Sequence, residues 1–168
     1  MLFLKAMNFD DIELEYEYIT NLPADENGFM NKYSNISYDE FKNIALPEFI
    51  NNSNGINLKP NHVACTEYFL WNDNEIVGLF RLRHYLNDNL KNGSGHIGYQ
   101  ISPKHRNKGY ATKGLELIIK IAKEIIPENE IYLSVNKNNH SSLKVQIKNG
   151  AYIHHENEDH FFTRIKIK

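Results

Sequence analysis

The stretch between residues 96 and 125 constrains the fold of this chain more than any other. It predicts a strand over Ile97–Ser102, because Pro103 follows and proline cannot donate to a sheet ladder. From about Lys108, apolar residues recur every three or four positions, which predicts a helix with one apolar stripe. A β-rich run over Ile131–Val135 comes next, so the strand–helix–strand order predicts a parallel crossover. The predicted stripe consists of Leu115, Ile118, Ile119, Ala122 and Ile125.

The loop between the predicted strand and helix combines positive charge with small residues. Four Lys or Arg side chains fall among residues 104–113, where the chain's 19 in 168 residues would give about one. A helix N-terminus presents unpaired N–H groups and a partial positive charge. Gly109 has no side chain to hold a ligand away from those groups, and Ala111 adds little bulk. The loop therefore predicts a seat for a phosphate or pyrophosphate, with a solvated basic helix start as the alternative.

The hexapeptide Arg106-Asn-Lys-Gly-Tyr-Ala111 resembles the Gln/Arg-x-x-Gly-x-Gly/Ala motif of the GNAT acetyltransferase superfamily. In that family this loop holds the pyrophosphate of acetyl-CoA. The run Gly98–Pro103 is similar to the family's central strand, and the run Leu82–Leu90 resembles a bacterial group of predicted acetyltransferases. The resemblance is good over Ala64–Tyr152 and looser in the N-terminal third.

The resemblance implies one acetyltransferase domain over residues 1–168, with a mixed α/β fold. The expected sheet is twisted and mostly antiparallel, with helices on both faces. Its central strands, Ile97–Ser102 and Ile131–Val135, are expected to splay apart and to hold acetyl-CoA in the gap. Residues 1–60 are expected to form a variable helical region on the acceptor side, and residues 61–168 the sheet and the acetyl-CoA-binding core.

Elsewhere the sequence predicts two helices ahead of the sheet, over Phe9–Leu22 and from Ser37 onward. The run Ser37-Tyr-Asp-Glu40 is typical of a capping box, and Pro47 is expected to kink or end the second helix. The segment Ala24–Ser34 is rich in turn residues. The other predicted elements are two antiparallel strands, a short helix and a final hairpin: Val63–Trp71, Ile76–His84, Ser142–Lys148, Tyr152–His155 and His160–Ile167.

The resemblance also implies which residues bind acetyl-CoA. Backbone groups of Gln100, Ile101 and Ser102 would run beside the pantetheine arm. Asn139, followed by Ser142, would contact the same arm, with a helix cap as the alternative. No metal is required. The residues implied to hold the pyrophosphate are Arg106, Asn107, Lys108, Gly109, Tyr110, Ala111 and Thr112.

Proton transfer is where this sequence departs from its relatives. Many relatives carry a tyrosine seven residues after the asparagine, as the proposed acid, and here that position is Gln146. At pH 7 a thiolate with a pKa of about 8.5 leaves at a cost of only about 2 kcal/mol. Removing a proton from a lysine-like amine costs about 4.6 kcal/mol, so a base is needed more than an acid.

His96 is the predicted base. Many relatives carry a glutamate ten residues before the Arg or Gln of the pyrophosphate loop, and that position here is His96. A histidine with a pKa of about 6.5 accepts a proton readily at neutral pH. The alternative is a packed, hydrogen-bonded and inert histidine. Tyr99 is a further candidate for proton handling, as is Tyr110, with simple aromatic packing as the alternative for both.

Several other polar residues are predicted to have structural rather than catalytic or metal-binding roles. Arg81 and Arg83 share one strand face and are predicted to pair with nearby acids, with an anionic acceptor group as the alternative. Cys65 lacks the context of a nucleophile. The histidines His154, His155 and His160 surround a predicted hairpin turn without cysteine partners, so no metal site is predicted there.

Composition excludes some classes of protein. A net charge of −2 argues against a general nucleic-acid binder. The single cysteine excludes an internal disulfide and fits a reducing cytoplasm. The run Met1–Lys5 is too short for a signal peptide, and no apolar run is long enough to span a membrane. A monomer or homodimer is expected.

The resemblance implies an enzyme, an acetyl-CoA-dependent N-acetyltransferase in which an amine attacks the thioester directly within a ternary complex. Backbone donors of the central strand would polarise the carbonyl. A small-molecule primary amine is the first choice of acceptor, because no long peptide groove is evident. A protein N-terminus or lysine is the second choice. A non-catalytic CoA-binding sensor stays open as a third hypothesis, because Gln146 replaces the tyrosine.

Overall fold

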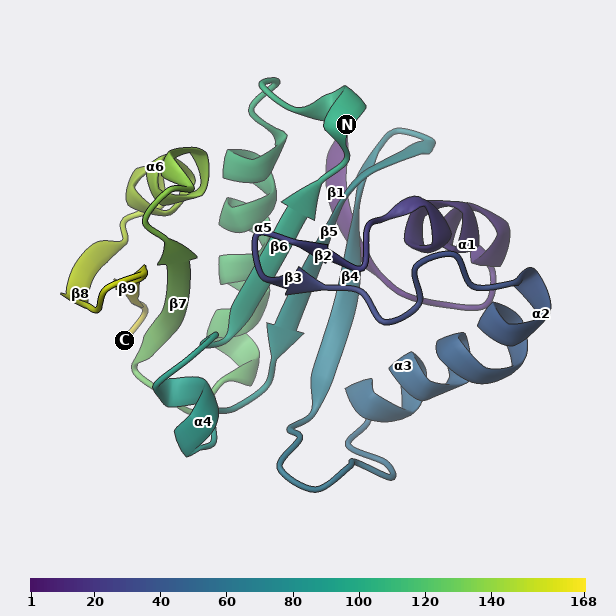
Figure 1. Ribbon diagram of the computed structural model, residues 1–168, viewed down its shortest axis with the longest axis horizontal. Coiled ribbons are helices and arrows are strands. Elements are labelled where there is room, and N and C mark those ends of the chain that lie inside the picture. The colour runs from purple at the N-terminus through teal and green to yellow at the C-terminus, as the bar shows by residue number, and fades with distance from the viewer.

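The computed structural model describes residues 1–168, and its strands lie in two main sheets and one small hairpin (Figure 1). The strands are β1 (Leu2–Ala6), β2 (Asp25–Glu26), β3 (Phe29–Met30), β4 (Cys65–Asn72), β5 (Glu75–Arg83), β6 (Ile97–Ile101), β7 (Glu130–Asn136), β8 (Tyr152–Glu156) and β9 (His160–Lys166). One sheet has the order β1-β4-β5-β6, the other has the order β7-β9-β8, and all neighbours in both are antiparallel.

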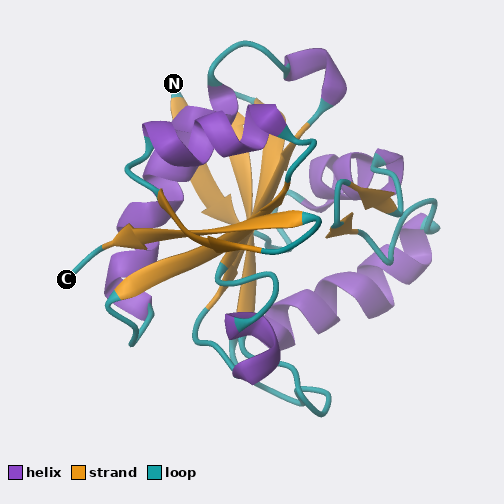
Figure 2. Cartoon of the chain, turned by 60° about the vertical axis from the view of Figure 1, so that its left-hand side comes forward, coloured by secondary structure: helices purple, strands orange, loops and turns teal.

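The helices pack on both faces of the strands (Figure 2). They are α1 (Ile12–Asn21), α2 (Tyr38–Glu40), the π-helical η1 (Phe41–Ala45), α3 (Leu46–Ser53), α4 (Asp88–Lys91), the 3-10 turn η2 (Pro103–His105), α5 (Tyr110–Ile125) and α6 (His140–Lys148). The predicted mixed α/β fold, mostly antiparallel with helices on both faces, is confirmed. None of these helices is both long and apolar enough to cross a bilayer.

Two hydrophobic cores separate the helices into two layers. The first core lies between α5 and one face of the strands, and it includes Leu115, Ile118, Ile119 and Ala122 of the predicted stripe. Ile125 is instead 37% exposed, and the next residue, Ile126, is buried in its place. The second core packs α1, η1 and α3 against the opposite face, with Phe41 and Phe69 fully buried.

The strands β6 and β7 diverge from a single point of contact. No ladder joins them, although their arrows point the same way in Figure 1. An isolated bridge between Gly95 and Leu133 ties them at one end, beside a 2.7 Å hydrogen bond from the His96 N–H to the Tyr132 carbonyl. A Cβ on Gly95 would lie 2.1 Å from that carbonyl oxygen, so only glycine permits the approach. The two sheets are therefore pinned at Gly95 and unpaired beyond it.

The helix that contains Pro47 follows its predicted start closely. The Ser37 side chain accepts from the Glu40 N–H, and the Glu40 carboxylate accepts from the Ser37 N–H, so the capping box is confirmed. The helix continues through Pro47, but a π-helical turn precedes it, in which the Leu46 N–H donates to the Phe41 carbonyl. Pro47 therefore coincides with an irregularity rather than an end, because tertiary packing holds the helix together on both sides of it.

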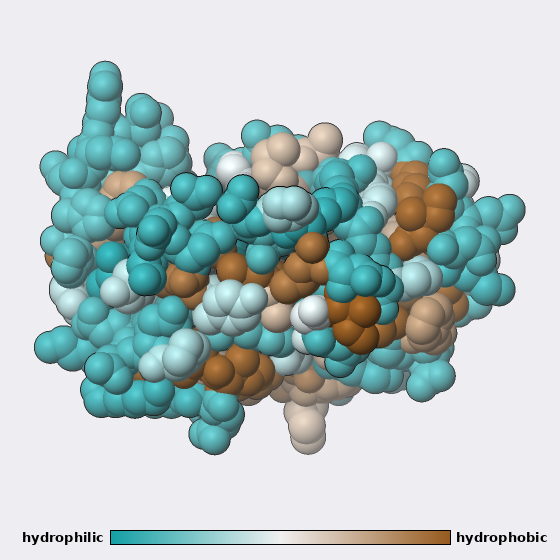
Figure 3. Space-filling model, turned by 90° about the horizontal axis from the view of Figure 1, so that it is seen from below, coloured by the Kyte–Doolittle hydropathy of each residue, from teal (hydrophilic) through white to brown (hydrophobic).

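Two elements in the first 60 residues are absent from the prediction. β1 pairs with β4, from Leu2 opposite Asn72 to Ala6 opposite Tyr68, so the N-terminal region also contributes an edge strand. Its pattern is weak because it is only five residues long and no side chain in it is fully buried. The turn-rich segment contains the hairpin β2–β3, whose turn residues Asn27 and Gly28 have φ of 52° and 84°. Seen from below, exposed hydrophobic residues form separate patches on a mostly hydrophilic surface (Figure 3).

Candidate active site

The start of α5 presents a row of unpaired backbone donors. Gly109 caps this helix with φ of 79°, a left-handed conformation that glycine adopts without strain, and Asn107 is also left-handed at 62°. None of the backbone N–H groups of residues 107–112 donates to another group of the protein, and the first that does is Lys113, to the Gly109 carbonyl. Residues 106–109 are exposed. This geometry supports the predicted seat for a phosphate or pyrophosphate.

The basic side chains of the loop are less available than its backbone. The Arg106 guanidinium donates to the Ile101 carbonyl at 3.0 Å and to the Glu26 carboxylate at 2.6 Å. Lys113 pairs with Glu116 on the next turn of the helix. The positive charge counted in the sequence is therefore partly neutralised within the protein, and the N–H groups are the principal free donors.

A groove of about 850 Å³ runs from this loop into the opening between β6 and β7. Lys108 and Ser102 lie outside its lining, and so does His96. Each of the remaining predicted residues lines it: Tyr99, Gln100, Ile101, Arg106, Asn107, Gly109, Tyr110, Ala111, Thr112, Asn139 and Ser142. Segments that are far apart in the sequence thus meet around one elongated space.

Asn139 and Ser142 lie at the α6 side of this groove. Asn139 caps the helix, because its side-chain oxygen accepts from the Ser142 N–H at 3.2 Å. Its amide nitrogen makes no hydrogen bond within the protein, so capping leaves Asn139 free to contact a ligand as well. The Ser142 Oγ lies 2.8 Å from the Tyr99 hydroxyl, which connects α6 to β6 across the opening.

The Tyr99 hydroxyl stays protonated at neutral pH, whereas Gln146 has no group acidic enough to protonate a thiolate. Burial raises the pKa of the Tyr99 hydroxyl to about 12, against the opposing effect of the neighbouring Ser142 and Gln146 side chains. Its ring stacks on Phe80, with centroids 5.4 Å apart, so its position is fixed by packing. Gln146, at the position of the family's tyrosine, is 1% exposed and accepts from the Thr163 hydroxyl at 2.7 Å.

His96 lies inside the protein, away from the groove. Its side chain is fully buried, its Nδ1 accepts from the Tyr132 N–H at 2.9 Å, and its Nε2 lies 3.0 Å from a Glu128 carboxylate oxygen. Since Nδ1 accepts, the proton is on Nε2 and is donated to Glu128. Burial also lowers the pKa of His96. This geometry favours the packed, hydrogen-bonded alternative, in which His96 fastens β7 to the chain just before β6; its role as a base stays a prediction.

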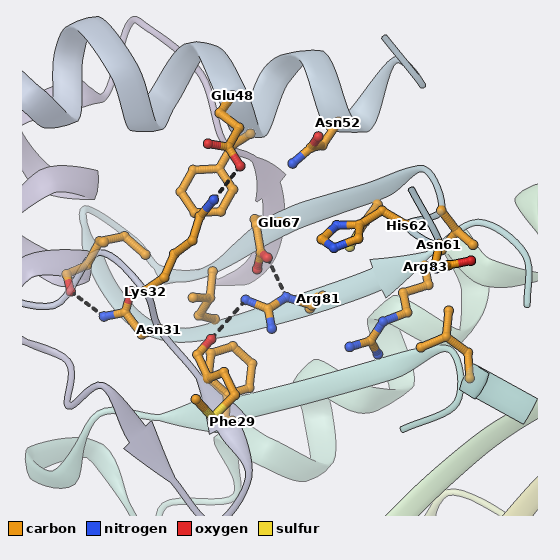
Figure 4. A pocket seen from close by; sticks show the side chains of 17 residues that line it. Phe29, Asn31, Lys32, Glu48, Asn52, Asn61, His62, Glu67, Arg81 and Arg83 are labelled. Carbon is orange, nitrogen blue, oxygen red and sulfur yellow. Dashed lines mark hydrogen bonds and ion pairs between the residues drawn. The ribbon is translucent and has the colours of Figure 1, made fainter. Parts of the chain in front are cut away.

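A second cavity of about 400 Å³ lies between the β2–β3 hairpin, α3 and the strands β4 and β5 (Figure 4). Arg81 donates from Nε to the Glu67 carboxylate at 2.5 Å, so the predicted pairing is confirmed for Arg81. It is wrong for Arg83, whose guanidinium donates only to the Gly95 carbonyl, at 3.1 Å. Figure 4 shows the two arginines side by side, with the Glu67 carboxylate next to Arg81.

The groove and the second cavity meet at three residues. Phe29, Arg81 and Arg83 line both spaces, so the groove and the second cavity adjoin at this junction. Phe29 and His62 are not among the sequence-predicted site residues, because they lie in a hairpin and a loop with no recognisable motif. The Asn27-Gly28 turn was the one available signal, since it predicts a hairpin beside Phe29.

Of the remaining polar candidates, Cys65 is unreactive, His154 and His155 lie outside both cavities, and His160 lines the groove. Burial raises the pKa of the Cys65 thiol to about 12, which agrees with its unreactive assignment. His154 and His155 are exposed and lie against each other, with Nδ1 atoms 2.8 Å apart. No three His, Cys, Asp or Glu side chains gather into a group that would hold a metal ion.

Comparison with known proteins gives one family and many structures of the same fold. A family model described as an acetyltransferase (GNAT) domain matches residues 3–152. A solved GNAT acetyltransferase of Streptococcus pneumoniae is 14% identical, with a TM-score of 0.66 and both chains fully covered. The spermidine N-acetyltransferase of Vibrio cholerae with CoA and spermine is 19% identical, with a TM-score of 0.64, covering 98% of this chain and 95% of that one. The Campylobacter jejuni N-acetyltransferase PseH with acetyl coenzyme A is 21% identical, with a TM-score of 0.59 and full coverage of both. No curated protein sequence matches the chain.

Proposed function

The chain belongs to the GNAT acetyltransferase family, and from this premise we propose that it acetylates the primary amine of a small molecule. It is an acyltransferase that uses acetyl-CoA, as the sequence predicts. The observation that carries the proposal is the junction: a groove that begins at free backbone donors meets a small second cavity at Phe29, Arg81 and Arg83. Donor and acceptor would approach each other there.

The groove supports acetyl-CoA binding through the backbone. The N–H groups of residues 107–112 would hold the pyrophosphate, because they are free and lie at the positive end of α5. The edge of β6 that faces β7 has no strand partner, so the backbone groups that Gln100 and Ile101 leave free there would hydrogen-bond the amides of the pantetheine arm. The Ser102 N–H is not available, because it donates to the Val77 carbonyl. Asn139 and Ser142 would bind the same arm from α6.

In the reaction, the amine nitrogen forms a bond to the acetyl carbon, the carbon–sulfur bond breaks, and the thiolate leaves. Tyr99 is the group best suited to protonate that thiolate, because its hydroxyl lines the groove and remains protonated at neutral pH. Gln146 has no acidic proton to offer. A proton donor recovers at most about 2 kcal/mol of the barrier at pH 7.

The proton of the amine is transferred to a base, and two histidines are candidates for that base. His96 has the position that the family resemblance favours, but it lies outside both cavities. His62 lines the second cavity, is exposed, and makes no side-chain hydrogen bond. A water molecule that carries the proton away is compatible with either. The base is therefore assigned by comparing variants of the two residues, as described in the Discussion.

The size of the second cavity supports a small acceptor, since about 400 Å³ holds a drug-sized molecule or less. A peptide N-terminus or lysine is the alternative, and a CoA sensor without turnover is the other. We further propose that the protein works in the cytoplasm, where a lone cysteine stays reduced, and that it is a monomer or homodimer.

A screen of CoA release tests the function. The full chain is incubated with acetyl-CoA and with polyamines, aminoglycosides, amino acids and short peptides, and free thiol is measured. Release with a small amine supports the proposal, and release with peptides alone supports the protein-acetylating alternative. Binding of CoA in a calorimeter without release by any acceptor indicates a sensor.

A further inference from the structure

Arg83 leaves the second cavity with one uncompensated positive charge. The charged side chains that line this cavity are Lys32, Arg81, Arg83, Glu48 and Glu67. Glu48 pairs with Lys32, and Glu67 pairs with Arg81. Arg83 has no carboxylate within salt-bridge distance, and its one hydrogen bond goes to a backbone carbonyl. Each acid of the cavity is thus paired with a cation, Glu67 through Oε1 only because its buried Oε2 has no hydrogen-bond partner, whereas Arg83 has no carboxylate partner.

Arg81 lies on the same strand face as Arg83, and its guanidinium has partners within the protein. Its guanidinium contacts the Glu67 carboxylate, the Met30 carbonyl at 3.3 Å and the Phe29 ring, whose centroid is 4.7 Å away. Arg83 has none of these contacts, and its remaining N–H donors have no acceptor in the protein (Figure 4). The two arginines therefore differ in their partners rather than in their strand or face.

The surroundings of Arg83 disfavour its charge. The side chain is half-buried, and burial lowers its pKa; the nearby charge of Arg81 lowers it as well, whereas Cys65 and Glu67 act in the opposite direction without outweighing burial. A half-buried cation without a counter-ion raises the free energy of the empty site, and an incoming anion would lower it again. A guanidinium binds carboxylate and phosphate through two parallel hydrogen bonds.

We infer that the acceptor amine also bears a carboxylate or phosphate group, and that Arg83 binds this group at the junction of the groove and the second cavity. The inference rests on the proposed function, because it names the acceptor of that reaction. A polyamine is disfavoured, since it would meet the positive charge of Arg83 and find each carboxylate of the cavity already paired with a cation. Arg83 thus selects the acceptor by charge.

Matched pairs of amines test this directly. CoA release by the full chain is measured with phosphoethanolamine against ethanolamine, with glycine against glycinamide, and with spermidine. We expect kcat/KM to be at least about tenfold higher for an anionic member, the size of one charge-assisted hydrogen-bond pair. In Arg83→Gln this ratio falls toward one. Arg83→Lys keeps part of it, because the charge remains while the planar fork is lost.

Lys59→Gln is the matched control. It removes a positive charge beside the same cavity, but Lys59 already pairs with Glu48 at 3.6 Å, so the ratio should stay at the wild-type value. An equal effect of both variants would mean general electrostatics and would overturn the inference. So would an equal loss for both members of each pair in Arg83→Gln, or a wild-type preference for spermidine.

A binding measurement separates this inference from the proposed function. If no amine is acetylated, the CoA-saturated protein is titrated with inorganic phosphate, since CoA then occupies the donors of residues 107–112. Heat of binding in the wild type that is lost in Arg83→Gln supports the anion site although the proposed function has failed. Equal binding by the two proteins, or none by either, overturns it.

Discussion

The hydroxyl of Tyr99 lies 2.8 Å from the Oγ of Ser142 and so bridges the opening between β6 and α6. This bridge brings a phenol to the side of the groove where Gln146 has replaced the tyrosine of related enzymes. In the proposed mechanism the proton donor is therefore Tyr99 on β6 rather than a residue on α6.

Tyr99→Phe should lower kcat by about tenfold to thirtyfold at pH 7, because a thiolate that leaves unprotonated costs about 2 kcal/mol. The deficit should shrink above pH 8.5, where the thiol needs no donor. CoA affinity, measured by calorimetry, should change little. The control is Ser142→Ala, which removes the Oγ partner but keeps the phenol and its hydrogen bond to the carbonyl of residue 142. An unchanged kcat in Tyr99→Phe would exclude the hydroxyl as the acid.

Substitution of His62 and substitution of His96 should change different properties of the protein. His62→Gln should lower kcat and leave stability unchanged if His62 accepts the amine proton. His96→Gln should instead lower stability by about 1–3 kcal/mol, because it breaks a buried hydrogen-bonded pair with Glu128. Chemical denaturation and steady-state kinetics measure both. A stable His96→Gln protein with greatly reduced kcat would restore His96 as the base.

His96 also predicts a dependence of stability on pH. Burial lowers its pKa in the folded state, so the unfolded chain takes up a proton first as the pH falls. Its contribution to stability is then complete above about pH 6.5 and is lost as the pH falls through the folded-state pKa. Urea denaturation between pH 7.5 and 5 should show a steeper loss in the wild type than in His96→Gln. Parallel curves would contradict this.

Glu15 should act in the opposite direction. Its side chain is fully buried, and burial raises its pKa to about 8 although the Asn8 N–H donates to it. The folded state therefore holds a proton that the unfolded state has lost, and stability falls as the pH rises from about 4.5 through 8. Glu15→Gln keeps an acceptor for Asn8 and should flatten this decline. Glu17→Gln, at an exposed position on the same helix, should leave the slope of the wild type unchanged.

Gly95→Ala should destabilise the protein far more than the same change at Gly150. Both glycines have left-handed φ, of 66° and 87°. A methyl group on Gly95 would meet the Tyr132 carbonyl at 2.1 Å, whereas on Gly150 it would meet nothing within 4 Å. Gly150→Ala therefore costs about 1 kcal/mol of backbone strain, and Gly95→Ala adds displacement of β7 to that. Similar melting temperatures for the two variants would show that the contact at Gly95 does not hold the sheets together.

Features that depend on neighbouring residues were visible in the sequence. The loop 106–112 and the stripe on α5 follow from a strand stop at Pro103, small residues near Gly109 and apolar spacing over one helix. The free N–H groups also follow locally, because the first turn of any helix lacks partners within the helix. β1 was invisible, since a short edge strand is stabilised by β4, more than 60 residues away in the sequence.

The sequence by itself therefore determined the family, the fold class and the backbone that would hold a diphosphate. Only the tertiary structure decided which side chains can do chemistry. His96 is buried and hydrogen-bonded to Tyr132 and Glu128, and the Tyr99 hydroxyl is hydrogen-bonded to Ser142 of α6. Arg81 pairs with Glu67, whereas Arg83 has no acidic partner. The reason is physical: burial and pairing depend on contacts between segments far apart in the chain, and residue spacing along the sequence carries no information about which of two adjacent arginines finds an acid.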